Sequence, residues 1–254
     1  MTSADSRTFA VRHVQLARAA FAAIAALMIT FSPDHSAAVG SAVFSGFAIA
    51  TGLVLLLSVW LVYPAGRRWP AAAIGGVTVA AGMASGLYPL RTVAGYFAIV
   101  IVWALLSGVL ELIAGWRGLA GRRERREIAP GIADARPAVP AGPRSESRDG
   151  AVIGAITILL GIGLLFVQPA YALDYTIEEA HATFTLTGIT IGVGLFGGYA
   201  AIVAVYLGIA GFSPRTADTA AVTAEPETAA SFTAESATAD APASADPTPQ
   251  KDSA

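Results

Sequence analysis

The sequence of 254 residues contains no cysteine, which excludes disulfides, thiolate metal sites and cysteine nucleophiles. It also carries little charge, because only 13% of its residues are charged, against about 25% in soluble domains. Its single lysine, Lys251, lies close to the end of the chain. Walker-type loops and the Gly-x-Ser-x-Gly and His-Glu-x-x-His motifs are missing. We therefore predict a protein that is not an enzyme and that has no cofactor and no metal site.

Long apolar runs dominate the rest of the chain, in which 55% of the residues are hydrophobic. Each run has about 18 residues or more, enough for a helix to cross a hydrocarbon core of roughly 30 Å. We predict an all-α membrane protein with six transmembrane helices. The runs cover residues 14–32, 37–63, 70–89, 92–116, 151–173 and 184–212.

Polar segments flank these runs and divide the chain. Residues 1–13 precede helices 1–4 (14–116), and a basic stretch, 117–150, separates them from helices 5–6 (151–212). The basic stretch has several prolines and glycines and little apolar periodicity, so we predict a loop. The tail, 213–254, consists of Ala, Thr, Ser, Pro and acids, and such a composition predicts disorder.

The positions of the basic residues predict the orientation of the helices. Arginine and lysine near span ends are retained on the cytoplasmic side, and Arg91 alone among the sixteen falls in a loop on the other side. We therefore place both termini and the 117–150 loop in the cytoplasm of a bacterium, with the helices in its plasma membrane. Arg18, near the start of the first run, is expected to extend toward the lipid headgroups.

The first run has a second interpretation as a cleaved signal peptide. Arg7, Arg12 and Arg18 form a basic start, and Ser36-Ala37-Ala38 offers small residues at a cleavage position. The predicted topology of the remaining helices is the same in both cases.

A weak internal repeat indicates how the helices are grouped. The first, third and fifth runs end near prolines 33, 89 and 169, and the third and fifth share Thr-x-x-x-Gly at Thr78 and Thr157. The second and fourth share Phe-Ala-Ile at 47–49 and 97–99. We predict three tandem helical hairpins; the alternative is that prolines favour helix ends and small residues favour membrane helices in general.

The segment that closes the fourth run, Ser107 to Arg117 (SGVLELIAGWR), is the nearest to a signature. Together with the repeat it resembles the HdeD-like bacterial membrane proteins over about residues 16–212. The resemblance implies a six-helix membrane protein linked to acid-stress resistance, with no catalytic residues to carry over. The leading functional prediction is thus a non-enzymatic protein that contributes to acid or envelope stress tolerance.

Glu111 is the one acid predicted at membrane depth, about 7.5 Å of helix rise inside the end of its run. It shares a helix face with Gly108 and Gly115, so we expect it to face another helix rather than lipid. One reading is a buried acid that is protonated or paired with a cytoplasmic arginine such as Arg67 or Arg68. The other makes Glu111 the coupling or selectivity group of a small transporter or channel.

Glycines at helical spacing predict close helix packing, inside one bundle or between two copies of the chain. Besides Gly108 and Gly115, these glycines are Gly82, Gly86, Gly188, Gly192, Gly194 and Gly198.

Three further features concern the surface. His35 and His181 lie in outer loops, where they are pH-sensing candidates or ordinary solvated residues. Arg122, Arg123, Arg125 and Arg126 follow the fourth helix and are candidates for binding anionic lipid headgroups, as well as for fixing topology. The loop or the tail would also suit a scaffold that recruits a soluble partner. No nucleic-acid partner is expected.

Overall fold

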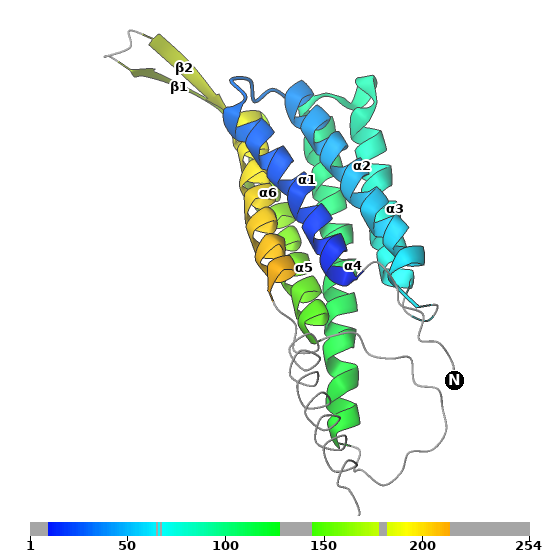
Figure 1. Ribbon diagram of the computed structural model, residues 1–254. Helices are drawn as coiled ribbons and strands as arrows, with labels where there is room; N and C mark the ends of the chain where they lie inside the picture. The colour runs from blue at the N-terminus through cyan, green and yellow to red at the C-terminus, as the bar shows by residue number, and fades with distance from the viewer. Residues whose placement is uncertain (1–9, 65, 67, 128–143, 178–181, 214–254) are drawn as a thin grey trace, which may run out of the picture. The chain divides into compact units, whose positions relative to one another are not determined.

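The computed structural model describes residues 10–64, 66, 68–127, 144–177 and 182–213 (Figure 1). The predicted disorder of the tail therefore falls outside the described residues. In chain order the elements are α1 (Val11–Phe31), α2 (Ala37–Leu61), α3 (Trp69–Gly86), the 3-10 turn η2 (Tyr88–Leu90), α4 (Val93–Glu127), α5 (Arg144–Phe166), β1 (Ala172–Ile177), β2 (Ala182–Thr187) and α6 (Gly188–Phe212).

Five of the described helices are long and apolar enough to cross a membrane: α1, α2, α4 over Val93–Ala120, α5 over Ser145–Phe166, and α6. The sixth long helix, α3, has 18 residues and is rich in alanine and glycine, and it is not among the five. The structure thus supports a helical, multi-pass membrane protein. Six spans remain a prediction.

The long helices lie side by side and contact one another in chain order, and α6 returns to α1 (Figure 1). The most extensive contacts join α4 to α5, α2 to α3, and α1 to α6. The predicted hairpin partners, α1 with α2, α3 with α4 and α5 with α6, also touch, but less extensively. The hairpin grouping therefore stays a prediction.

Glycine opposite glycine explains two of the close helix pairs. A Cβ atom on Gly52 of α2 would lie 2.9 Å from the carbonyl oxygen of Gly75 on α3. In the same way, a Cβ atom on Gly108 of α4 would lie 2.9 Å from the carbonyl oxygen of Gly154 on α5. Larger residues at these places would push the backbones apart, since membrane helices approach closely through small residues.

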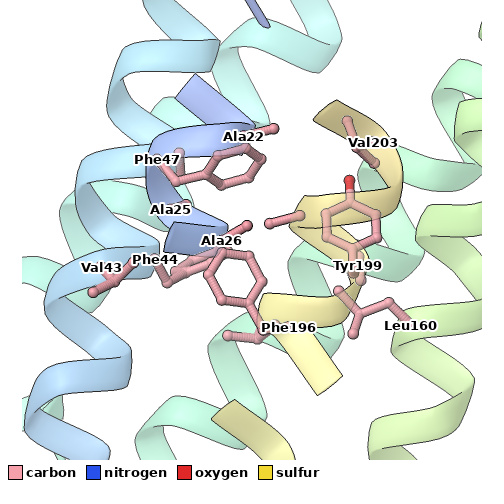
Figure 2. Packing of buried hydrophobic residues seen from close by; sticks show 14 of the residues in the cluster. Ala22, Ala25, Ala26, Val43, Phe44, Phe47, Leu160, Phe196, Tyr199 and Val203 are labelled. Atoms are coloured by element: carbon pink, nitrogen blue, oxygen red, sulfur yellow. The ribbon is translucent and has the colours of Figure 1, made fainter. Parts of the chain in front are cut away.

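Aromatic side chains fill the centre of the bundle (Figure 2). Phe44 and Phe47 of α2 meet Trp103 of α4 and Phe196 of α6 edge to face, with ring centroids 5.0–6.0 Å apart. Tyr199 stacks on Phe196 at 6.3 Å. These ring contacts connect α2, α4 and α6 in the middle of the bundle.

The two ends of the bundle differ. At one end, here called the basic end, α1, α3 and α5 begin and α2 and α4 approach their ends; Arg68 and Arg117 lie there with the exposed Trp69 and Trp116. At the other end, here called the hairpin end, the strands β1 and β2 connect α5 to α6 (Figure 1).

The structure corrects the predicted ends of the fourth and fifth helices. α4 continues to Glu127 and α5 begins at Arg144, so both extend into the stretch 117–150 that was predicted as a loop. Arginine and glutamate are good helix formers, which explains how the sequence RRERRE after Gly121 continues a helix after the apolar run stops. Residues 128–143 lie outside the described part.

The strands were not predicted at all. The fifth run was expected to continue to residue 173 and the sixth helix to begin at 184, but α5 ends at Phe166 and α6 begins at Gly188. Between them β1 and β2 pair antiparallel, from Ala172 opposite Thr187 to Ile177 opposite Ala182. The segments ALDYTI and ATFTLT alternate apolar and polar residues, which is the usual signal for a strand.

Candidate functional site

A buried ion pair joins α1 to α4. Arg18 Nη1 donates to Glu111 Oε1 at 2.8 Å, and Nη2 approaches Oε2 at 3.4 Å. Only 14% of the Arg18 side chain and 10% of the Glu111 side chain are exposed. The prediction that Arg18 extends toward headgroups was therefore wrong, because its side chain points into the bundle. Glu111 does pair with an arginine, but the partner is Arg18 and not Arg68. Arg68 donates through Nε to the carbonyl oxygen of Tyr63, and Arg67 lies outside the described residues.

The helix faces explain why these two charges meet. Arg18 shares its side of α1 with Ala22 and Ala25, which are buried against the bundle. Glu111 shares its side of α4 with Gly108 and Gly115, and a Cβ atom on Gly115 would lie 2.6 Å from the carbonyl oxygen of Ser147 on α5. The prediction that Glu111 faces protein is confirmed.

A second polar network ties α1, α5 and α6 together nearby. Gln15 Nε2 donates to Asp149 Oδ2 at 2.9 Å, and the Tyr206 hydroxyl donates to Asp149 Oδ1 at 3.2 Å. Asp149 was not predicted as a site residue because it was assigned to the loop. Its position two residues before an apolar run could have indicated it, because a helix can begin before its apolar part and would then include Asp149.

These charged groups line a cavity at the basic end, with about 370 Å³ of space that the centre of a water molecule can occupy. Its outer part is formed by residues such as Gly66 and Trp69, which are exposed. Arg18 and Glu111 are among its buried lining residues. Its other polar lining residues are Gln15, Tyr63, Arg117, Glu146, Ser147 and Asp149.

A much smaller chamber adjoins the cavity, with about 10 Å³ of space for the centre of a water molecule. It shares Arg18, Glu111, Leu55 and Ile74 with the cavity. Arg18 and Glu111 therefore border both spaces. The hydroxyl-bearing residues around the chamber are Thr51, Thr78, Ser107, Thr157 and Tyr199.

Two of these threonines make matching contacts. Thr78 of α3 donates to the Ile74 carbonyl and accepts from Trp103 Nε1 of α4 at 3.2 Å. Thr157 of α5 donates to the Ile153 carbonyl at 2.8 Å and lies 3.0 Å from the Tyr199 hydroxyl of α6. Because Thr157 uses its one hydroxyl proton on the carbonyl, Tyr199 is the donor to it. The shared Thr-x-x-x-Gly pattern thus marks equivalent polar contacts between successive helices.

The remaining predicted packing glycines divide into two groups. Gly82 lies against α2, with a Cβ position 2.9 Å from Ile49 N, and Gly192 lies against Phe97 of α4. The positions of Gly86 and Gly188 are also close to neighbouring atoms. In contrast, a Cβ atom on Gly194 or Gly198 would meet nothing within 4 Å, so packing inside the bundle was the wrong prediction for both. Several contact glycines, such as Gly52 and Gly75, were missed because they have no partner at GxxxG spacing.

The structure describes only part of the predicted surface sites. His35 lies half-buried in the connection between α1 and α2, whereas His181 is outside the described residues. Arg122, Arg123, Arg125 and Arg126 belong to α4 by their backbone. Within the described ranges, no group of three or more His, Cys, Asp or Glu side chains is placed to hold a metal ion.

Comparison of the chain with protein-family models, with curated proteins and with solved structures finds no match.

Proposed function

We propose that this integral membrane protein binds a small polar or charged solute in the cavity at its basic end and passes it through the bundle, with the Arg18–Glu111 pair as the inner gate. The observation that carries this proposal is the buried ion pair at the junction of the cavity and the hydroxyl-lined chamber. The aromatic cluster around Phe44 and Trp103 would then close the path in the conformation described.

The energetics of the pair support a functional role. Moving two charges out of water costs several kcal/mol per ion, and apolar residues of similar volume often give equal or greater stability. Ionisable residues inside membrane segments are accordingly rare and are associated with solute or proton pathways. If the pair served only to hold α1 against α4, close packing of small residues, as between α4 and α5, would achieve the same contact without the cost of burying two charges.

The membrane arrangement proposed for this role has six spans, with both termini in the bacterial cytoplasm. The 18 residues of α3 measure about 27 Å along the helix axis, close to the thickness of a hydrocarbon core. α3 also packs along α2, and the exposed Trp69 and Tyr88 lie at its two ends. Retention of the first helix is part of the proposal, because α1 provides Arg18 and packs along α6.

The experiment compares survival across external pH for cells that lack the protein and produce the parent, Glu111→Gln or Arg18→Gln. Loss of survival in both variants, with unchanged amounts of folded protein in the membrane, is the result that transport predicts. If both variants protect cells as well as the parent does, the ion pair is structural and the gate proposal is wrong. Deletion of residues 213–254 separates the scaffold alternative, which predicts loss of function on removal of the tail.

We include in this proposal a physiological role in acid or envelope stress tolerance, which the HdeD-like resemblance implies. Movement of a solute through a cavity with charged lining residues is one way in which a non-enzymatic membrane protein would contribute to stress tolerance. Binding of anionic headgroups by the 122–126 arginines and assembly with a second copy of the chain are further expectations. For assembly, the outward-facing Gly194 and Gly198 offer a helix surface on which a second helix would fit closely.

A further inference from the structure

The chamber behind the ion pair contains two polar atoms whose hydrogen bonds are unaccounted for. Thr51 Oγ1 and Arg18 Nε are buried and have no hydrogen-bond partner among the described residues. Both residues line the same chamber, and only 5% of Thr51 is exposed. A buried hydroxyl without a partner costs about 1–3 kcal/mol, and a charged donor costs more.

The space is suited to one water molecule. A buried water needs roughly 10–15 Å³ of space for its centre and two to four polar partners. The chamber provides about 10 Å³. The guanidinium of Arg18 disfavours a cation there, and the carboxylate of Glu111 disfavours an anion, so the neutral molecule is the one that both charges admit.

We propose that one ordered water occupies the chamber, accepts a hydrogen bond from Arg18 Nε and donates one to Thr51 Oγ1. The water would satisfy both buried atoms at once and link α1 to α2. Hydration would thus continue from the cavity past the ion pair to the centre of the bundle. This inference does not depend on transport, because it concerns only the closed conformation.

The test uses the sign of a stability change. Thr51→Val keeps the side-chain shape but removes the hydroxyl. If the hydroxyl holds a water, Val weakens that water and leaves Arg18 Nε poorly satisfied, so the thermal midpoint of the purified protein should fall by about 2–4 °C. If the hydroxyl is unpartnered, its removal relieves a buried polar group, and the midpoint should rise.

Two control variants calibrate this result. Thr51→Ser keeps the hydroxyl and should behave nearly as the parent does. Ser41→Ala removes a second hydroxyl that is buried without a hydrogen-bond partner among the described residues and that does not line the chamber. The midpoint of this variant should stay constant or rise.

The direct measurement is an experimental density map of the full chain that shows other buried waters. A peak within hydrogen-bond distance of Thr51 Oγ1 and Arg18 Nε, absent from the Thr51→Val map, is the expected result. A rise in midpoint for Thr51→Val like that of Ser41→Ala overturns the inference. So does a parent map in which the chamber has no peak, whichever way the midpoint moves.

Discussion

Arg18 and Glu111 lie 93 residues apart in the chain, and yet their side chains meet at 2.8 Å inside the bundle. The contact joins the α1–α6 pair of helices to the α4–α5 pair, the two pairs that the Gln15–Asp149–Tyr206 network also connects. The α2–α3 pair contributes apolar walls, such as Leu55 and Ile74, to the cavity and the chamber. The polar contacts around the cavity therefore involve α1, α4, α5 and α6, whereas α2 and α3 contribute apolar lining residues.

Breaking the ion pair from one side should destabilise the protein more than removing it completely. Arg18→Leu and Glu111→Leu each leave one buried charge without its partner, a change that costs about 3–5 kcal/mol. The double variant leaves none, so its thermal midpoint should recover most of the loss. Midpoints of the three variants in detergent provide the measurement. Additive losses in the double variant would show that the two side chains act independently.

Two glycines on different helices provide a matched test of packing. Gly108→Leu should strongly reduce stability, because the new side chain would begin 2.8 Å from Ile158 Cγ1 and 2.9 Å from the Gly154 carbonyl. Gly194→Leu should leave the midpoint almost unchanged, because nothing lies within 4 Å of its Cβ position. Equal effects of the two substitutions on the midpoint of the monomer would contradict the helix packing. A change in oligomeric state specific to Gly194→Leu would identify that surface as a contact between copies.

The absence of cysteine makes topology directly measurable. Single cysteines at Asp34 and Thr176 should react with an impermeant thiol reagent in intact cells, because both positions lie at the hairpin end. Asp34 is in the connection between α1 and α2, and Thr176 is in β1. A cysteine at Ser145, at the basic end, should react only after the membrane is opened. Labelling of Ser145→Cys in intact cells would contradict the proposed orientation, which follows from the arginine positions.

The sequence predicted well whatever depends on hydrophobicity. Apolar runs located the long helices, and the face shared by Glu111 with Gly108 and Gly115 correctly predicted its burial, because period 3.6 fixes which residues lie together. The partner of Glu111 was missed because the two residues are 93 positions apart. Their pairing depends on how α1 packs against the other helices, and no local sequence pattern specifies that packing.

Other errors had local causes. The strands β1 and β2 were overlooked because two flanking apolar runs were extended into them, although their period-2 alternation was visible. The helical ends of α4 and α5 were missed because polarity was taken as a sign of a loop, while arginine and glutamate also favour helix. Asp149, a central acceptor of the site, was lost with them.

The central claim is that a water-accessible cavity extends from the basic end to the Arg18–Glu111 pair, and that this pair keeps solutes out of the chamber that it also lines. Three single cysteines on α4 test it. Ala114 lines the cavity, Ser107 lines only the chamber, and Ile113 lines neither and is 40% exposed on the outside of the bundle. A positively charged thiol reagent is applied to inside-out vesicles, and reaction rates are measured with and without Glu111→Gln.

Ala114→Cys should react readily in both backgrounds, and Ile113→Cys in neither, because the ionised reagent does not enter lipid. Ser107→Cys should be protected by the intact ion pair and should react at least about tenfold faster with Glu111→Gln, the change that roughly 1.4 kcal/mol of lost closure produces. An unreactive Ala114→Cys, or a Ser107→Cys that reacts equally in both backgrounds, would contradict the account.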